Sequence, residues 1–455
     1  MRAIPTLKIS ISGVRGVVGE SLTPQLLVRF AQAFGTYAGA GAICVGRDTR
    51  TSGEMVRQAV VAGLLSSGCR IIDLGVCPVP TVQLMVRTLR ARGGICITAS
   101  HNPAEWNALK FIDSAGLFLG AGQARQLLDI YHQGGYRKVA GAEMRAVEPL
   151  DGAIDLHVKA ILDALGPLPR SGRRLRVAVD SCNGAGSVVA PRLLEALGVE
   201  VFPINVTPSG TFPRGAEPLP ENLIALCDVV RREGCDVGFA QDMDADRLAV
   251  VDERGEAVGE ESTLVLAARY VLGREPGPLV ANLATTGALD AVAARFGCPV
   301  YRSKIGEANV AEEMLRRRAV IGGEGNGGVI YPRINFARDS LVGMALVLHL
   351  LAEAGAHVSE LLAELSPSYM VKEKLSCRSD RIRAALKAVS EAYADRPLDV
   401  RDGVKVTTEA GWFLVRGSNT EPILRLVAES PTAEGARALL DDVRARVLES
   451  VGGHH

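Results

Sequence analysis

The chain repeats one arrangement three times: an apolar, β-branched run, then a short polar turn, then a stretch with helical spacing of its apolar residues. The three copies begin at Gly94, Arg176 and Leu279. Strands that alternate with helices predict α/β units with mixed, mostly parallel sheets, and the loops at their strand ends face a shared cleft. This repeat constrains the fold class more than any other feature of the sequence.

Length and local composition predict how these units are divided. At 455 residues the chain is too long for one hydrophobic core, and a segment rich in Gly and Pro, 166–172, precedes the second copy. The C-terminal part differs, because runs at 404–408, 412–415 and 423–427 are typical of antiparallel strands, closed by a helix over 433–449. We therefore predict three similar α/β domains and a C-terminal α+β domain around one cleft. Their predicted ranges are 1–150, 151–253, 254–366 and 367–455.

Charge and composition exclude several classes of function. The chain has 51 basic and 51 acidic residues and 4% aromatic residues, which gives no support for a partner such as nucleic acid or a membrane surface. Its nine cysteines contain no Cys-x-x-Cys pair, so they indicate buried thiols in a reducing compartment rather than disulfides or a zinc site. No apolar stretch is long enough to span a bilayer. We expect a cytoplasmic monomer or homodimer that acts on a small molecule.

A serine hydroxyl lies at the end of the first apolar run. The hexapeptide Thr98-Ala99-Ser100-His101-Asn102-Pro103 follows Gly94–Ile97, and its Asn-Pro pair ends the strand in a turn. Ser100 therefore projects from a strand-terminating loop with the His101 imidazole beside it, a position where α/β proteins carry functional groups. Serine is also an ordinary turn residue, so the loop alone does not establish a site.

An acidic triplet follows another buried run. Asp242, Asp244 and Asp246 alternate with small or apolar residues, and a tight loop can turn all three carboxylates inward, where they need a hard divalent cation such as Mg²⁺. An EF-hand is an alternative, but Arg247 stands where its sharp turn needs glycine. An aspartyl-phosphate phosphatase is another, with Asp242 as the nucleophile.

Two further loops suit the binding of sugars and phosphates. The glycine-dense loop 322–328 carries Glu324 and Asn326, which can hydrogen-bond hydroxyl groups. The second loop, 416–422, follows a strand and offers a guanidinium, hydroxyls and an amide, the chemistry of a phosphate cradle. Its candidate residues are Arg416, Ser418, Asn419 and Thr420. Arg15 near the chain start and the loop 46–50 after another strand add candidate cations.

Taken together, these loops resemble those of the α-D-phosphohexomutase family, which includes phosphoglucomutase, phosphomannomutase and phosphoglucosamine mutase. The resemblance spans essentially the whole chain, and the serine, acidic, sugar and phosphate loops follow the family's order. It implies a phosphoryl shuttle in which Ser100 carries the phosphate and a hexose 1,6-bisphosphate is the activator and intermediate. It also implies a Mg²⁺ site formed by Asp242, Asp244, Asp246 and the phosphorylated Ser100.

The resemblance assigns roles to further residues. Arg15, His101 and Arg247 would add positive or hydrogen-bonding groups at the reacting phosphate, and Lys110 matches the family's lysine, a candidate for proton transfer. Glu324 and Asn326 would contact the sugar hydroxyls, while the residues of loop 416–420 would bind the phosphate that is not reacting. A closed cleft would exclude water from the phosphoryl group.

The sequence departs from the family pattern at one position that matters for proton transfer. Many members end the sugar loop with Ser-Gly-His, whereas Gly328 stands at the histidine's place here. Proton transfer then falls to Lys110 and His101 or to another residue, for which Glu307 is a candidate. We include Glu307 and Ser303, from the preceding loop, among the predicted substrate-binding residues.

The preferred substrate and two rival functions stay open. The loop sequences favour phosphoglucosamine mutase over a phosphomannomutase/phosphoglucomutase of dual specificity, although Asn419 favours the second. A metal-dependent phosphatase with Asp242 as nucleophile is a rival hypothesis. A catalytically silent sugar-phosphate sensor is another, because the loop histidine is missing.

Overall fold

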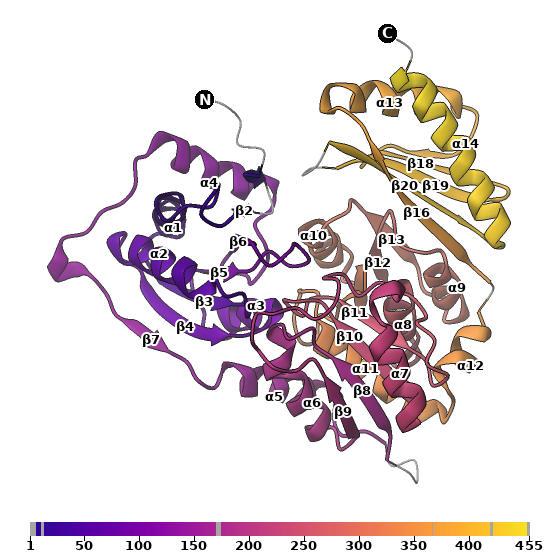
Figure 1. Ribbon diagram of the computed structural model, residues 1–455, viewed down its shortest axis with the longest axis horizontal. Coiled ribbons are helices and arrows are strands. Elements are labelled where there is room, and N and C mark those ends of the chain that lie inside the picture. The colour runs from indigo at the N-terminus through magenta and orange to yellow at the C-terminus, as the bar shows by residue number, and fades with distance from the viewer. Residues whose placement is uncertain (1–5, 11–12, 170–173, 366, 419–421, 453–455) are drawn as a thin grey trace.

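The computed structural model describes residues 6–10, 13–169, 174–365, 367–418 and 422–452. These residues form four sheets, and each sheet lies within one of the four predicted ranges. In Figure 1 the sheets follow one another round an arc, from the first at the left, through the second at the bottom and the third at the right, to the fourth at the top right. Three mostly parallel α/β sheets and a C-terminal α+β unit confirm the predicted fold class.

The first sheet has seven strands in the order β1-β2-β6-β5-β3-β4-β7. Strands β3, β4, β5 and β7 are parallel to one another, whereas β1, β2 and β6 extend the sheet by antiparallel pairing. The strands are β1 (Lys8–Ser10), β2 (Gly13–Val17), β3 (Ala42–Arg47), β4 (Arg70–Val76), β5 (Gly93–Ile97), β6 (Trp106–Ile112) and β7 (Val147–Pro149). The helices are α1 (Pro24–Ala38), α2 (Gly53–Ser66), α3 (Val79–Thr88) and α4 (Ala121–Gln133), with the 3₁₀ turn η1 (Gly141–Glu143).

The second sheet has the order β11-β10-β8-β9, in which only β11 is antiparallel to its neighbour. Its strands are β8 (Arg176–Asp180), β9 (Glu200–Ile204), β10 (Val237–Gln241) and β11 (Leu248–Val251). Its helices are α5 (Ala153–Leu165), α6 (Ala190–Ala196) and α7 (Ile224–Glu233), with 3₁₀ turns η2 (Ala185–Val188) and η3 (Pro220–Asn222). The helical stretch after β8 is split into η2 and α6, because Pro191 lacks an N–H group and lies at the start of the new helix.

The third sheet repeats this plan in the order β13-β12-β14-β15, with β15 antiparallel to β14. Its strands are β12 (Leu279–Asn282), β13 (Val300–Ser303), β14 (Ile321–Glu324) and β15 (Gly328–Ile330). Its helices are α8 (Glu261–Arg274), α9 (Ala288–Arg295), α10 (Glu307–Arg317), α11 (Ser340–Ala354) and α12 (Val358–Ala363).

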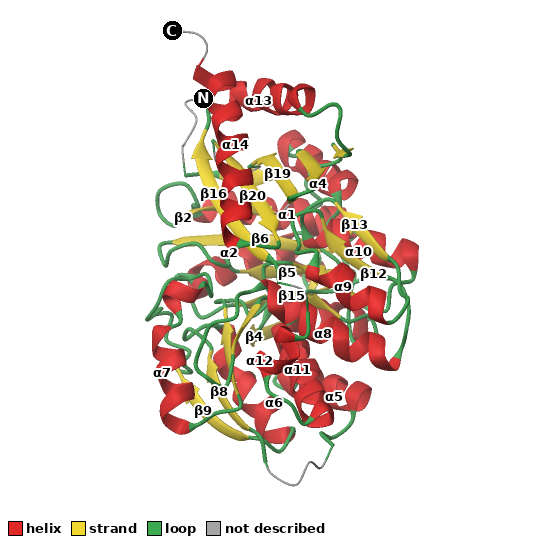
Figure 2. Ribbon diagram, turned by 90° about the vertical axis from the view of Figure 1, so that its right-hand side faces the viewer, coloured by secondary structure: helices red, strands yellow, loops and turns green. Residues whose placement is uncertain are grey.

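The fourth sheet is entirely antiparallel, in the order β16-β20-β19-β18-β17. It contains β16 (Tyr369–Ser376), β17 (Leu398–Asp399), β18 (Val404–Thr408), β19 (Gly411–Gly417) and β20 (Ile423–Ser430). Helices α13 (Ser379–Ala392) and α14 (Ala433–Gly452) complete it, and α14 lies along the sheet in Figure 2. The sequence analysis did not predict strand β16. Its residues alternate between exposed and half-buried, so the sequence has no strong apolar pattern there.

The loops that the sequence analysis singled out all follow strands that pair with the next strand of the chain. Residues 98–105 connect the antiparallel pair β5–β6, and residues 242–247 connect β10–β11. Residues 325–327 connect β14–β15, and residues 418–422 connect β19–β20. The serine, acidic and sugar loops are therefore turns of hairpins, and the hydrogen bonds of two paired strands fix the ends of each turn. Residues 419–421 of the fourth loop lie outside the described residues.

The second and third sheets share one hydrophobic core. It extends from Val158 in α5 to Leu361 in α12, and α11 runs through its centre. Thirteen of the fifteen residues of α11 are buried, as expected for a helix that is apolar on nearly all sides. The first and fourth sheets have separate cores. In the described part of the chain, no helix has both the length and the apolar character needed to cross a membrane.

A buried chain of hydrogen bonds joins helices of the first, second and third domains. His157 of α5 contacts Thr81 of α3 through Nδ1 at 2.9 Å and Asp339, the N-cap of α11, through Nε2 at 2.8 Å. All three residues are almost inaccessible to solvent. Asp339 also accepts hydrogen bonds from the backbone N–H groups of Leu341 and Val342, so the chain fixes the start of the central helix.

We expect His157→Ala to lower the stability of the protein by about 2–4 kcal/mol, because it leaves Thr81 and Asp339 buried without a partner. Thermal unfolding measures the change as a fall of several degrees in melting temperature. His132→Ala, at an exposed position of α4, is the control. An unchanged melting temperature for His157→Ala would contradict this role.

Candidate active site

Ser100 lies buried in the β5–β6 turn in a left-handed backbone conformation, with φ of +49°. Its N–H donates to Thr98 Oγ1 at 3.0 Å, and its hydroxyl donates to Asp242 Oδ2 at 3.2 Å. The same hydroxyl lies 3.5 Å from His101 Nδ1. A non-glycine residue in this conformation is uncommon and needs support from its surroundings.

Arg50 supplies that support. Its guanidinium is buried, pairs with Asp48 at 3.0 Å and lies 3.1 Å from Met243 Sδ in the acidic loop. Its other hydrogen bonds go to backbone carbonyl groups of the serine loop, those of Ser100 (2.7 Å), Asn102 (2.7 Å) and Pro103 (2.5 Å), and to the carbonyl of Trp106 (3.0 Å) at the start of β6. Arg50, in the loop 46–50 that the sequence analysis singled out, therefore directs its donors at the serine loop.

The three aspartates of the acidic loop converge. Asp242, Asp244 and Asp246 are buried, and each offers a carboxylate oxygen within 4.8 Å of the others. The loop joins two antiparallel strands rather than two helices, which contradicts the EF-hand alternative. Backbone contacts hold it from three sides, because Val79 N–H donates to Asp244, Ala185 N–H to Met243 and Ser340 N–H to Ala245.

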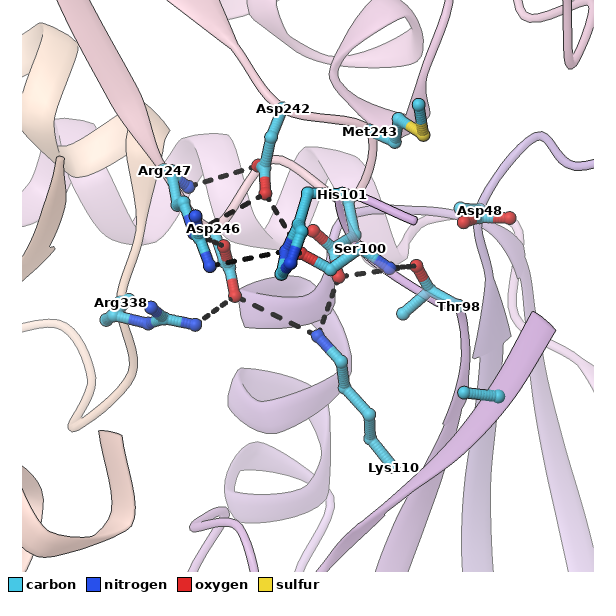
Figure 3. Close-up of polar contacts among 12 residues, drawn as sticks. Asp48, Thr98, Ser100, His101, Lys110, Asp242, Met243, Asp246, Arg247 and Arg338 are labelled. Carbon is cyan, nitrogen blue, oxygen red and sulfur yellow. Dashed lines mark hydrogen bonds and ion pairs between the residues drawn. The ribbon is translucent and has the colours of Figure 1, made fainter. Parts of the chain in front are cut away.

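The contacts of the aspartates leave room for a cation. Lys110 on β6 donates to Asp244 Oδ2 at 2.7 Å. Arg338 donates to Asp246 Oδ2 at 2.5 Å (Figure 3). The remaining oxygens, Asp244 Oδ1 and Asp246 Oδ1, are buried without a hydrogen-bond partner. Buried carboxylate oxygens without donors fit a hard divalent ion, which prefers all-oxygen ligands.

The surroundings of the cluster shift the pKa values of Asp242 and Asp244 in opposite directions. Burial, together with the charges of Asp246 and Asp244, raises the pKa of Asp242 well above its usual value. Burial also opposes ionisation of Asp244, but the ammonium group of Lys110 outweighs it and lowers the pKa of Asp244. Asp244 is therefore an anion paired with Lys110, whereas Asp242 accepts a proton more readily.

His101 and Arg247 flank Ser100 on the other side. Burial and the positive charges of Arg247 and Arg15 lower the pKa of His101 to about 2, so the imidazole is neutral. Arg247 Nη2 lies 3.4 Å from His101 Nδ1, and Glu217 faces both residues, at 3.9 Å from His101 Nε2 and 3.6 Å from Arg247 Nη1. Arg15 donates to Asn102 at 3.1 Å.

A cavity of about 330 Å³ opens beside Ser100. The predicted residues that line it are Arg15, Ser100, His101, Lys110, Arg247, Glu307, Glu324 and Asn326. Glu324 accepts hydrogen bonds from Asn282 (2.7 Å) and the Gly306 N–H (2.8 Å), and Asn326 keeps a buried Oδ1 without a partner. Burial is the main reason that the pKa of Glu307 rises to about 7.

Other predicted residues lie apart from this cavity. Ser303 donates its hydroxyl to the Lys304 carbonyl and is not among the described lining residues. Arg416 on β19 pairs with Asp402 at 2.8 Å, and Asp402 also accepts the N–H of Ile305, which lines the cavity. The described residues that line the cavity belong to the first three domains. The fourth domain contacts this lining through the hydrogen bond between Asp402 and Ile305. Ser418 N–H bonds to the Ile423 carbonyl. Asn419 and Thr420 lie outside the described residues.

Known families match this chain along its length. Four models of the phosphoglucomutase/phosphomannomutase family match in order. They are alpha/beta/alpha domain I over residues 7–138, domain II over 149–255, domain III over 260–369, and the C-terminal domain over 371–446.

Curated relatives match at full length. A probable phosphoglucosamine mutase of Methanopyrus kandleri is 39% identical over 97% of this chain and 98% of its own. The chain belongs to the phosphoglucomutase/phosphomannomutase family. A second member, a phosphoglucomutase/phosphomannomutase of Thermococcus kodakarensis, is 38% identical over 94% of this chain and 96% of its own.

Solved structures of the family have the same fold. A phosphoglucomutase/phosphomannomutase family protein of Burkholderia thailandensis superposes with a TM-score of 0.85 at 26% identity, over 99% of this chain and 97% of its own. A putative phosphomannomutase of Thermus thermophilus gives a TM-score of 0.81 at 29% identity, over 98% of this chain and 100% of its own.

Three residues of the site escaped the sequence analysis. Arg338 and Glu217 belong to no motif, and their contacts span long distances along the chain. Arg50 lies in the loop 46–50 that the sequence analysis singled out. Nothing in the local sequence indicates that this charged side chain is buried. An alignment of related sequences, by showing whether these positions are conserved, could have identified them.

We expect Asp244→Asn to abolish the binding of Mg²⁺, because the change removes one of three converging carboxylates. Isothermal titration with MgCl₂ measures binding, and the melting temperature of the unchanged protein rises with Mg²⁺ while that of the variant does not. Asp228→Asn, which removes an exposed carboxylate on α7, is the control. Equal Mg²⁺ affinity in the unchanged protein and Asp244→Asn would contradict the site.

We expect Arg50→Lys to loosen the serine loop, because an ammonium group cannot donate in the guanidinium's fixed directions. Amide hydrogen exchange over residues 100–106 should speed up by roughly 10-fold or more, the effect of losing charge-assisted hydrogen bonds. Arg57→Lys, on the surface of α2, should leave the exchange of this segment unchanged. Unaltered exchange in Arg50→Lys would show that the loop is held by other contacts.

Proposed function

We propose that this protein is a phosphohexomutase that moves a phosphoryl group between the 1- and 6-positions of a hexose phosphate, with Ser100 as its carrier and a hexose 1,6-bisphosphate as activator and intermediate. The observation that carries the proposal is the position of Ser100. Its hydroxyl faces the converging aspartates on one side and, on the other, a cavity lined by sugar-loop residues and cations. The nine cysteines are free, which supports a reducing, cytoplasmic location. We further propose a monomer or homodimer.

The aspartate cluster is proposed to hold Mg²⁺. Asp242, Asp244 and Asp246 would be its ligands, joined by the phosphoryl group of Ser100, and two of these carboxylates have buried oxygens without donors. When bound, the ion would offset the charge that spreads over the phosphoryl oxygens during transfer.

Ser100 is proposed to alternate between hydroxyl and phosphoserine. When the hydroxyl takes a phosphoryl group, a bond forms between Oγ and phosphorus and the bond from phosphorus to the sugar oxygen breaks. The hydroxyl donates to Asp242 Oδ2 at 3.2 Å, so Asp242 is the acceptor that we propose for its proton. The left-handed turn held by Arg50 fixes Oγ for this step, and positioning is the main contribution to such transfers.

Cations around the cavity are proposed to bind the reacting phosphate. Arg15 and Arg247 line the cavity beside Ser100, and Lys110 keeps its proton because Asp244 and Asp246 raise its pKa despite burial. Lys110 lines the same cavity as Ser100 and is thus our proposed proton donor for an oxygen that leaves phosphorus there. Arg416, Ser418, Asn419 and Thr420 are proposed to bind the second phosphate.

Glucosamine phosphate is proposed as the preferred substrate. Several relatives, including that of Methanopyrus kandleri, carry the name probable phosphoglucosamine mutase. Glu307, Glu312 and Glu324 line the cavity, and Glu307 and Glu324 are paired with Arg338. The carboxylate of Glu312 is the one that we propose for the cationic 2-amino group of glucosamine. The alternative is a phosphomannomutase/phosphoglucomutase of dual specificity, the name of the Thermococcus kodakarensis relative.

Treatment with radiolabelled glucose 1,6-bisphosphate and Mg²⁺ should leave an acid-stable phosphate on the peptide that contains Ser100. We expect the label and all mutase activity to disappear in Ser100→Ala and to persist in Ser209→Ala, which removes an exposed serine. Acid-labile label on Asp242 would instead support the phosphatase alternative. Neither label nor turnover of any hexose phosphate would support the silent sensor and refute the mutase.

The substrate proposal predicts the order of kcat/KM values for the phosphates of glucosamine, glucose and mannose, measured with bisphosphate activator and Mg²⁺. We expect glucosamine phosphate to exceed the other two by about 10-fold or more, the gain from one charge-assisted contact. Glu312→Gln should reduce this preference, because it removes one carboxylate from the cavity wall. Equal values for mannose and glucose phosphates, both above glucosamine phosphate, would favour dual specificity.

A further inference from the structure

The space beside Gly328 is occupied by a side chain from another part of the chain. A Cβ atom at position 328 would lie 2.3 Å from Cδ of Arg338 and 2.8 Å from its Cγ, so no larger residue fits while Arg338 is in place. Position 328 is where many family members end the sugar loop with histidine. Arg338 can therefore occupy this space only because residue 328 is glycine.

Arg338 connects three carboxylates that belong to different elements. Its Nη2 donates to Asp246 in the acidic loop at 2.5 Å, and its Nη1 donates to Glu324 in the sugar loop at 2.9 Å. Its Nε donates to Glu307 at the start of α10 at 3.0 Å. The side chain is 10% exposed, and only the planar fork of a guanidinium presents donors in three fixed directions.

The backbone on either side of the Arg338 side chain is fixed. The N–H of Asp339 donates to the Val329 carbonyl on β15 at 2.8 Å, and the hydroxyl of Ser340 donates to the Ala245 carbonyl in the acidic loop at 2.6 Å. Asp339 is further held by His157. Arg338 therefore projects from a segment that is already tied to both loops whose carboxylates it joins.

We propose that Arg338 is a positioning residue that occupies the space beside Gly328 and holds Asp246 and Glu324 in one fixed arrangement for binding an anionic sugar phosphate. This inference rests on the proposed function. Arginine stays protonated under all physiological conditions, so Arg338 supplies charge and hydrogen bonds but transfers no proton. Proton transfer at this end of the cavity then falls to other groups, Lys110 among them.

Removing the Arg338 charge leaves three buried carboxylates facing the site of an anionic ligand. We expect Arg338→Ser to raise the KM for hexose phosphate, and the calorimetric Kd for glucose 1,6-bisphosphate, by roughly 10- to 100-fold, with a smaller change in kcat. Arg338→Lys keeps the charge without the fork and should give an intermediate increase. Arg333→Ser, which removes an exposed arginine paired with Glu275, is the control.

The steric dependence allows a reciprocal test. Gly328→His alone should lower both activity and melting temperature, because the imidazole meets the Arg338 stem. Gly328→His combined with Arg338→Ser opens that space, and the imidazole then lies beside the carboxylates that Arg338 had joined. We expect the double variant to bind glucose 1,6-bisphosphate at least threefold more tightly than Arg338→Ser and to melt above Gly328→His. Gly122→His, at a position with open space, is the control.

The outcomes separate this inference from the proposed function. If the unchanged protein isomerises no hexose phosphate, the proposed function fails whatever Arg338 does. If it isomerises them but Arg338→Lys and Arg338→Ser keep the original KM and Kd, the inference fails. A fall in melting temperature without a change in KM or Kd, or strictly additive effects of the 328 and 338 substitutions, would likewise overturn it.

Discussion

The structure depends on the neutralisation of three aspartate carboxylates that are buried within 4.8 Å of one another. Such a cluster is costly unless cations and hydrogen-bond donors surround it. The nearest cations come from three different domains: Lys110 from β6, Arg247 from the start of β11, and Arg338 from the start of α11. Their attraction to the same cluster ties the three domains together, so the charge that suits metal binding also holds the site in shape.

A repeated hairpin explains why the functional loops meet. In the second and third domains, three parallel strands end in one antiparallel neighbour, and the turn to that neighbour carries the acidic loop in one case and the sugar loop in the other. The serine loop occupies the corresponding turn of the first sheet. Because paired strands fix both ends of each turn, short polar loops can hold charged and strained residues such as Ser100 without losing their position.

The sequence predicts the parts of the molecule whose structure depends on neighbouring residues in the chain. The strands before the Ser100 and Asp242 loops and the fold class follow from apolar runs that end in polar turns, and the structure agrees. Arg50 and Arg338 could not be predicted, because their contacts include partners 52 and 92 residues away in the chain, Asn102 and Asp246. Gly328 shows the same limit, since the sequence marks a missing histidine but not the side chain that fills its place.

The central claim is that Ser100 carries a phosphoryl group directly against the aspartate cluster, and ³¹P nuclear magnetic resonance tests it. The protein would be phosphorylated with glucose 1,6-bisphosphate, freed of sugar and titrated with Mn²⁺, a paramagnetic substitute for Mg²⁺. We predict one phosphoserine resonance that broadens beyond detection at stoichiometric Mn²⁺, and that stays sharp when the same phosphorylated protein is titrated with diamagnetic Mg²⁺. A phosphoserine resonance that stays sharp in the unchanged protein with Mn²⁺ would contradict the account.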